Sequence, residues 1–466
     1  MPLALHYSDL ETALDRPDQL ARLVGLVESL RDDRTLVVGT GDDTAPGALP
    51  LVTDGRAVLD AVDALAPDAD VPGNHDFDAG VAAARDVLAA TPQPYLAANL
   101  YDGTERAPAV EPWVVRETAD ARVGLVGVAH PETGKMNPEA ADLRFEPVRP
   151  AVDEAVAAVR ERGVDHVVVL AHLGRGSNGG SGGVPGGRDL AQDLDVAAVL
   201  DGHAHKHVAT VVDGTVYARG GQGASHLNLV DLAARSVEPR RVGPDAPLHE
   251  GTATSLRERA REAGLTDVVA TLDRPVRCDR PAVRAGESRI GNLVADAYRR
   301  RAEADVALVA PAAIRAGPDL SGAVTAWDLC RLVPFRDELV SLAVDGATLR
   351  RALARATGDP YPAWADWYFG HYAGVRLRYD EAAAEVLSVD VGGAPLADRR
   401  TYRLATTDYY VRSDHLFPDL TPDLVVDRHG PQYEAVLGAL RDGLGVPELS
   451  GRVDRVGFEG VPDDAY

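Results

Sequence analysis

The fold is decided by one stretch of eight residues, Gly73-Asn74-His75-Asp76-Phe77-Asp78-Ala79-Gly80. It follows residues 69–72, which we expect to form a short strand, and it precedes an expected helix. A parallel α/β sheet presents its ligands at such a point, just beyond the carboxyl end of a strand. Asn, Asp and Gly are also ordinary turn residues, so the stretch alone does not distinguish a site from a polar turn.

Four further polar clusters follow apolar runs in the same way. They are Asp9 and Glu11 after residues 2–7, Asp42 after 35–39, His172 after 166–170, and His203 with His205 after 196–200. Strands made of continuous Val, Leu and Ala are buried on both faces. The pattern therefore predicts a layered α/β fold whose polar side chains gather along one edge.

These clusters supply oxygen and nitrogen donors without sulfur, a mixture that suits Mn, Fe, Zn or Co in two-metal sites. Taken singly, each histidine is an ordinary loop residue, and Asp42 is equally a helix cap. Five clusters in order at expected strand ends favour a metal site over that alternative.

The charge of the chain limits its partners. It carries 72 Asp and Glu against 48 Lys and Arg, a formal net charge of -24, whereas a nucleic-acid polymer needs a basic surface. Lysine occurs only at Lys135 and Lys206. So acidic a composition resembles proteins adapted to concentrated salt and predicts a halophilic protein, although a GC-rich genome would also favour Arg over Lys.

Two cysteines, Cys278 and Cys330, are too few and too far apart for a disulfide framework or a thiolate metal site. The first residues lack the pattern of a secretory leader, and no window reaches the ~18 apolar residues of a membrane span. We expect a cytoplasmic protein without a membrane partner, and the sequence leaves its oligomeric state open.

The five clusters together resemble the motifs of calcineurin-like metallophosphoesterases. The extended run Gly-Asn-His-Asp-Phe-Asp at residues 73–78 narrows the resemblance to the 5'-nucleotidase family, which includes UDP-sugar hydrolase and 2',3'-cyclic-nucleotide phosphodiesterase. The resemblance implies a four-layer α/β sandwich, with helices flanking two packed sheets, followed by an α+β substrate-binding domain.

The resemblance also implies roles for the clustered residues and two divalent metal ions, Mn, Zn, Co, Fe or Mg. One ion would be held by Asp9, Asp42 and His205, and the other by Asp42, Asn74, His172 and His203, with Asp42 bridging. His75, oriented by Asp78, would stabilise the transition state or protonate the leaving oxygen. Glu11 stands where the family has His, and as a harder ligand it would favour Mn or Mg.

We expect the metallophosphoesterase domain at residues 1–240 and the substrate-binding domain at residues 266–466. Between them, residues 241–265 would form a linker with a connecting helix. The Pro-rich composition of residues 238–247 favours this boundary.

In the second half, Arg284, Arg315, Phe335, Tyr409 and Asp414 would each pass for ordinary surface or core residues. The resemblance implies that they bind substrate: Phe335 and Tyr409 would sandwich a base and the arginines would bind its polar end. The segment at Ala310 and the loop that contains Asp414 depart from the family pattern, which implies altered contacts to base or ribose.

We therefore expect a 5'-nucleotidase of nucleotide catabolism that acts on a nucleotide-like small molecule, through in-line attack by a metal-bridging hydroxide. A 2',3'-cyclic-nucleotide phosphodiesterase or nucleotide-sugar hydrolase is the enzymatic alternative. The alternative of another class is a catalytically weak metal- or nucleotide-binding protein.

Overall fold

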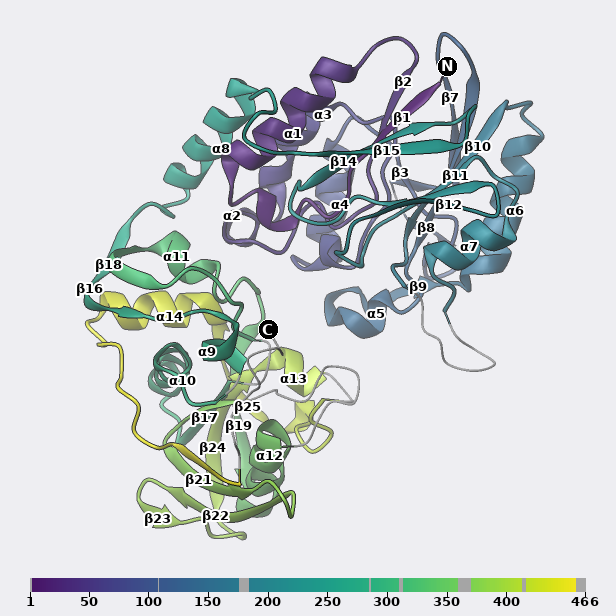
Figure 1. Ribbon diagram of the computed structural model, residues 1–466. Coiled ribbons are helices and arrows are strands. Elements are labelled where there is room, and N and C mark those ends of the chain that lie inside the picture. The colour runs from purple at the N-terminus through teal and green to yellow at the C-terminus, as the bar shows by residue number, and fades with distance from the viewer. Residues whose placement is uncertain are drawn as a thin grey trace. The chain divides into compact units, whose positions relative to one another are not determined.

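The computed structural model describes residues 2–107, 109–175, 184–284, 286–309, 313–358, 370–412 and 416–457. The chain divides into two compact units, Met1–Ala263 (unit 1) and Gly264–Tyr466 (unit 2). Each unit has its own sheets and helices (Figure 1).

Unit 1 is built on two sheets. The first has the order β15 (Ser236–Arg241), β14 (His226–Asp231), β1 (Leu3–His6) and β2 (Thr35–Val38). The second has the order β12 (Val208–Val212), β13 (Thr215–Arg219), β11 (Ala198–Asp201), β10 (His166–His172), β8 (Arg122–Ala129) and β7 (Trp113–Glu117). Strands β1 and β2 run parallel, as do β8, β10, β11 and β13, so each set has its carboxyl ends at one edge.

The two sheets pack face to face through one apolar core. Ala4, Leu36 and Val38 of the first sheet join Leu125 and Leu170 of the second in this core. Helices α6 (Val148–Arg160) and α7 (Gly187–Asp193) pack on the outer face of the second sheet, and in Figure 1 helices α1 (Pro17–Leu30), α3 (Leu59–Leu65) and α8 (Glu250–Glu262) lie on the opposite side of the unit. This is the four-layer sandwich that the family resemblance implied.

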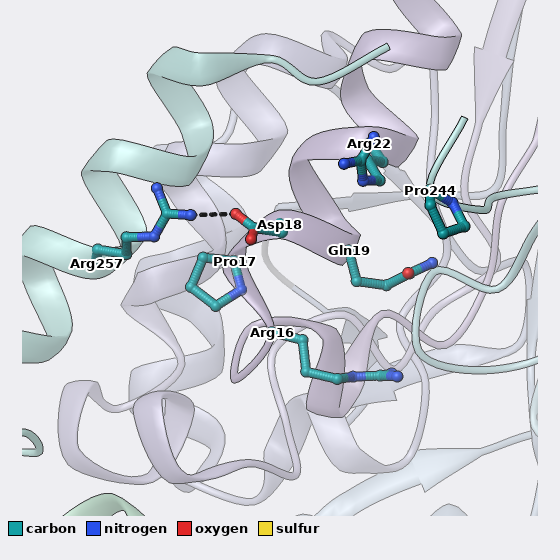
Figure 2. Close-up of a pocket in the computed structure, with 7 residues that line it drawn as sticks. All are labelled: Arg16, Pro17, Asp18, Gln19, Arg22, Pro244 and Arg257. Atoms are coloured by element: carbon teal, nitrogen blue, oxygen red, sulfur yellow. Dashed lines mark hydrogen bonds and ion pairs between the residues drawn. The ribbon is translucent and has the colours of Figure 1, made fainter. Parts of the chain in front are cut away.

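Helix α8 is part of unit 1, and side-chain contacts as well as packing hold it against helices α1 and α3. Arg257 pairs with Asp18 at the start of α1, and Arg259 binds Asp60 of α3 with two hydrogen bonds of 2.7 Å each. Figure 2 shows the first pair in the wall of a pocket of about 330 Å³, which Arg16 and Arg22 also line. The helix expected within the linker is thus packed against the first unit.

Two local expectations were wrong. Within the described chain, residues 69–72 make isolated bridges, Val38 to Ala69 and Asp70 to Tyr95, but no strand. Pro72 has no N–H, and the N–H of Val71 donates to the Asp70 carboxylate. Neither residue can therefore donate a backbone hydrogen bond to a neighbouring strand. Residues 236–241, partly assigned to the Pro-rich connector, form the edge strand β15, where Pro239 is tolerated because an edge strand need not donate on its outer side.

Unit 2 contains a five-stranded sheet in the order β20 (His371–Ala373), β17 (Val306–Val309), β24 (Thr401–Thr407), β19 (Glu338–Asp345) and β25 (Val425–Pro431). A four-stranded sheet has the order β23 (Ala394–Pro395), β22 (Glu385–Val391), β21 (Val375–Asp380) and β26 (Val453–Val456), and β16 (Val268–Val276) pairs with β18 (Leu320–Thr325). Its helices are α9 (Arg280–Arg284), α10 (Arg289–Arg301), α11 (Ala326–Cys330), α12 (Gly346–Gly358), α13 (Asp408–Arg412) and α14 (Gln432–Arg441). Unit 2 is therefore an α+β domain, as predicted.

None of the helices in the described part of the chain has both the length and the apolar character of a membrane span.

Candidate metal centre

The predicted metal-binding side chains come together where strands of the two sheets end. Asp9 and Glu11 follow β1, Asp42 follows β2, His172 ends β10, and His203 and His205 follow β11. Their ligand atoms form two groups, Asp42 with His172 and His203, and Asp9 with Glu11 and His205, within 4.8 Å in each group. A third group, Glu11, Asp42 and His75, overlaps both, so the two clusters are neighbours.

His172 is oriented by the backbone of a neighbouring strand end. Its Nδ1 lies 2.6 Å from the carbonyl oxygen of Thr40, which can only accept, so Nδ1 carries a proton and donates it. Its Nε2 then points at Asp42 Oδ2, 3.0 Å away. His203 Nδ1 lies 2.8 Å from Asn74 Oδ1, which adds the amide to the first group.

The second group is held in a similar way. His205 Nε2 lies 2.9 Å from Glu11 Oε1 and 3.9 Å from Asp9 Oδ1. Asp9 Oδ1 also accepts the backbone N–H of His203 at 3.0 Å, which connects the two groups. Glu11 thus lies among the candidate ligands and is only 2% exposed.

The donors fit divalent cations. Glu11 Oε1, Asp42 Oδ2 and His172 Nε2 are buried, and among the described residues each faces only one other candidate ligand atom at about 3 Å, a histidine nitrogen or a carboxylate oxygen. Two ligands at right angles around a cation, each at about 2.1 Å, also stand about 3 Å apart. Carboxylate oxygens and imidazole nitrogens at this separation are therefore placed to bind a divalent cation.

The electrostatics of the cluster lead to the same conclusion. Burial raises the pKa of Asp9 to about 8, and the carboxylates of Asp42 and Glu11 add to the shift. Burial lowers the pKa of His203 to about 3, so its ring is neutral and can act as a ligand. Added positive charge would therefore stabilise the ionised form of Asp9. Burial would raise the pKa of Asp42 as well, but the His172 ring outweighs it and holds that pKa below its usual range.

The backbone is strained at the candidate ligands. Asp9, Glu11, Asp42 and His203 have φ values of 50°, 40°, 56° and 69°, in the left-handed region that residues other than glycine rarely adopt. Such strain persists only where the surroundings impose it, and it concentrates at functional sites. Gly73 meets a different requirement, because a Cβ at this position would lie 2.1 Å from Asp42 Oδ1.

Two buried carboxylates organise the loops without belonging to either cluster. Asp76 accepts backbone N–H groups from Asp42, Asp43, Thr44 and Gly73, and so joins two ligand loops. Asp201 Oδ1 accepts the N–H groups of Leu173, Gly174 and Gly202, and so joins the loops that follow His172 and precede His203.

His75 and Asp78 form the predicted pair. The Nδ1 atom of His75 lies 3.0 Å and 3.2 Å from the two Asp78 oxygens, which leaves Nε2 free to face a substrate. Burial by itself would lower the pKa of His75, but the Asp78 carboxylate raises it to about 10. His75 therefore holds a proton at neutral pH that it can donate.

Two further residues at this edge were not predicted from the sequence. His130 follows β8, and its ring centroid lies 5.1 Å from that of His203. The position of His130, directly after an apolar run, is the same signal that identified the other clusters. Asn137 donates hydrogen bonds to the Asn74 carbonyl oxygen and to Asp78, but an Asn before Pro138 indicates only a turn.

In unit 2, the expected substrate-binding residues gather partly at one sheet edge. Phe335 precedes β19 and Tyr409 follows β24, and these ends are joined by Glu338 N–H donating to Asp408 Oδ1 at 2.8 Å. The Arg315 guanidinium lies over the Phe335 ring at 4.9 Å. Arg284 ends α9, whereas Asp414 and Ala310 lie outside the described residues.

Two protein families match different parts of the chain. The calcineurin-like phosphoesterase family matches residues 3–207, and the 5'-nucleotidase C-terminal domain matches residues 268–421. Protein UshA of Yersinia enterocolitica is 23% identical over 406 residues, which cover 76% of this chain and 73% of that protein.

Solved structures share the fold over nearly the whole chain. The 5'-nucleotidase precursor of Thermus thermophilus superposes with a TM-score of 0.75 at 21% identity and covers 98% of this chain and 99% of its own. The sulfate thiohydrolase SoxB of Thermus thermophilus reaches 0.66 at 20% identity, covering 98% and 97%. At these identities the superpositions show the fold alone.

Replacement of Gly73 by Ala tests the packing of the metal centre. The added Cβ would displace the Asp42 carboxylate, so we expect Gly73→Ala to bind less metal and to lose activity. The measurement is metal content by elemental analysis after dialysis. Gly214→Ala is the control, because a Cβ at Gly214 would meet no atom within 4 Å. The φ of Gly214, 86°, is itself strained for alanine, so this control also reports the effect of backbone strain alone. Full metal content in Gly73→Ala would contradict the geometry.

Proposed function

We propose that the chain is a member of the 5'-nucleotidase family of calcineurin-like phosphoesterases, whose two domains match residues 3–207 and 268–421, and that it releases phosphate from a nucleotide. The observation that carries the proposal is the meeting of seven candidate ligands with the His75–Asp78 pair at one edge of the sandwich. A protein that only bound metal would have no need of a proton donor held beside the cluster.

The chain would hold two divalent cations, with Asp42 between them. Asp9, Glu11 and His205 would bind one cation, and Asn74, His172 and His203 the other. When bound, such ions supply a Lewis acid for phosphoryl oxygens and a nucleophile from water near neutral pH. Because Glu11 adds a hard, charged oxygen where the family has an imidazole, we propose Mn or Mg for its site in preference to Zn.

His75 would act on the leaving group. Asp78 fixes Nδ1, so the proton on Nε2 is the one that the ring presents, and its raised pKa keeps that position protonated at neutral pH. Donation of this proton to the departing ester oxygen would prevent the release of a strongly basic alkoxide. Asp78 would also stabilise the positive charge of the imidazolium until the transfer occurs.

Unit 2 would supply recognition of the base. Phe335 and Tyr409 lie at the ends of paired strands, and Arg315 adds a planar cation to one face of Phe335. Aromatic and guanidinium planes of this kind stack on bases. The sulfate thiohydrolase SoxB shares this fold, so the fold alone does not identify the substrate.

A phosphate-release assay tests the proposed reaction. We expect activity on nucleoside 5'-monophosphates with Mn or Mg, and a loss of roughly 10²-fold or more in turnover for His75→Ala at unchanged metal content. UDP-glucose and 2',3'-cyclic AMP, assayed in the same series, test the two enzymatic alternatives. Because their first hydrolysis products carry the phosphate as an ester, these products are followed by chromatography. A chain that binds metal but hydrolyses none of these esters would be the weak binding protein.

Replacement of Phe335 tests base recognition. A base stacked on this ring would lose about 1 to 3 kcal/mol in Phe335→Ala, so we expect KM for a nucleoside monophosphate to rise about ten-fold. Hydrolysis of glycerol phosphate, which has no base, should scarcely change. Equal losses on both substrates would identify Phe335 as a core residue, and no loss on either would exclude a bound base.

We also propose that the protein is adapted to concentrated salt, because counter-ions would screen the self-repulsion of a chain with net charge -24. We expect its melting temperature and activity to hold or rise from low salt to molar KCl, measured by calorimetry and phosphate release. A steady fall of the melting temperature over this range would contradict the proposal. The cytoplasmic location stays a prediction.

A further inference from the structure

The proton donor of the site stands on a single short turn. His75 opens the 3-10 helix η3 (His75–Phe77), with Asn74 as its N-terminal cap residue and Asp78 as its C-terminal one. Such a turn has poorer hydrogen-bond geometry than an α-helix. In the described structure, Asn74 does not cap the turn with a side-chain hydrogen bond. The Asp76 carboxylate ties the turn to the Asp42 loop, and Asp42 Oδ1 accepts the N–H of His75 at 2.7 Å. Neither contact involves the Asp78 side chain, which orients the His75 ring.

Asn137 contacts both ends of that turn. Its Nδ2 donates to the carbonyl oxygen of Asn74 at 2.8 Å and to Asp78 Oδ1 at 2.9 Å. Asn137 lies between helix α5 (Thr133–Met136) and the short helix Pro138–Ala140, 59 residues beyond Asp78 in sequence, and is 7% exposed. One buried amide thus spans the turn from its first cap residue to its last.

The geometry of an amide makes this contact rigid. The two N–H bonds of Nδ2 lie in one plane at a fixed angle, so the Asn74 oxygen and Asp78 Oδ1 are held at a fixed separation. The remaining atom, Oδ1, accepts the backbone N–H of Glu139 at 3.0 Å, which anchors the amide itself. Both donors and the acceptor of the side chain are therefore used.

Asp78 Oδ1 receives Asn137 and also faces His75 Nδ1 at 3.2 Å. Without the amide, the carboxylate could rotate about its own bond, and the imidazole that depends on it could rotate too. A ring that turns in this way no longer presents Nε2 to the leaving oxygen, and misplacement by about 1 Å can cost 10²-fold in rate.

We propose that Asn137 is a positioning residue for proton donation, which braces the η3 turn and fixes Asp78 and, through it, His75. The inference rests on the proposed function, because the leaving-group role of His75 does. It adds a third residue to the pair and connects the pair to the segment after β8.

Three variants separate positioning from folding. Asn137→Ala removes all the contacts, whereas Asn137→Ser keeps an oxygen that can cap residues 138–140 but lacks the amide donors. Asn99→Ala is the matched control. Asn99 is fully buried and donates to Ala129 and Glu146 carbonyl oxygens, as Asn137 does to its partners, but it does not touch η3.

We expect both Asn137 variants to keep their metal and to lose about 10- to 100-fold in kcat on a nucleoside monophosphate, the usual cost of removing a supporting hydrogen bond at such a site. The loss should be smaller on nitrophenyl phosphate, whose leaving group needs no proton. In a His75→Ala background, Asn137→Ala should cost nothing further. Asn99→Ala should lower the melting temperature without any leaving-group dependence.

A readout independent of turnover completes the test. In ¹⁵N-histidine NMR spectra, the Nδ1–H signal of His75, assigned by its loss in His75→Ala, should be protected from solvent exchange in the wild type and exposed in both Asn137 variants. Unchanged protection would overturn the proposal, and so would an equal kcat loss in the His75→Ala background. If the wild type hydrolyses no ester, the proposed function fails, and the NMR comparison still decides whether Asn137 fixes His75.

Discussion

Three almost fully buried carboxylates share one edge of unit 1, and the balance of their charge is the constraint on which the site depends. Asp9, Glu11 and Asp42 are each 1% or 2% exposed, and they lie close enough to belong to overlapping groups of ligands. Burial of like charges is costly unless opposite charge or hydrogen-bond donors accompany them. Backbone N–H groups from His75 and His203 provide part of that compensation, and His172 and His205 face the carboxylates directly.

The sandwich provides what this arrangement needs from the backbone. Parallel strands from two packed sheets deliver the ligand loops to one edge, and Asp76 and Asp201 hold those loops by their N–H groups. The left-handed conformations at Asp9, Glu11, Asp42 and His203 persist only where the surrounding structure imposes them. The apolar core between the sheets stabilises this strained edge.

The convergence of the candidate ligands other than Asn74 was predictable because each follows an apolar run, and parallel strands bring their carboxyl ends together. The same reasoning applied to His130 would have included it. Asn137 could not be found in this way, since its role depends on a contact with residues 59 and 63 positions away and its sequence context indicates only a turn. The edge strand β15 was missed because Pro239 and charged neighbours read as a connector, although both are compatible with the outer edge of a sheet.

The same edge strand also affects the behaviour of the molecule in solution. β15 closes the first sheet of unit 1 with Glu238, Pro239, Arg240 and Arg241, side chains that are exposed and mostly charged. An unprotected edge offers backbone donors and acceptors to a strand of another chain, and Pro and charged residues are the means by which natural proteins prevent that pairing. The exposed proline and charged side chains of β15 thus also protect this edge of the sheet from aggregation at high concentration.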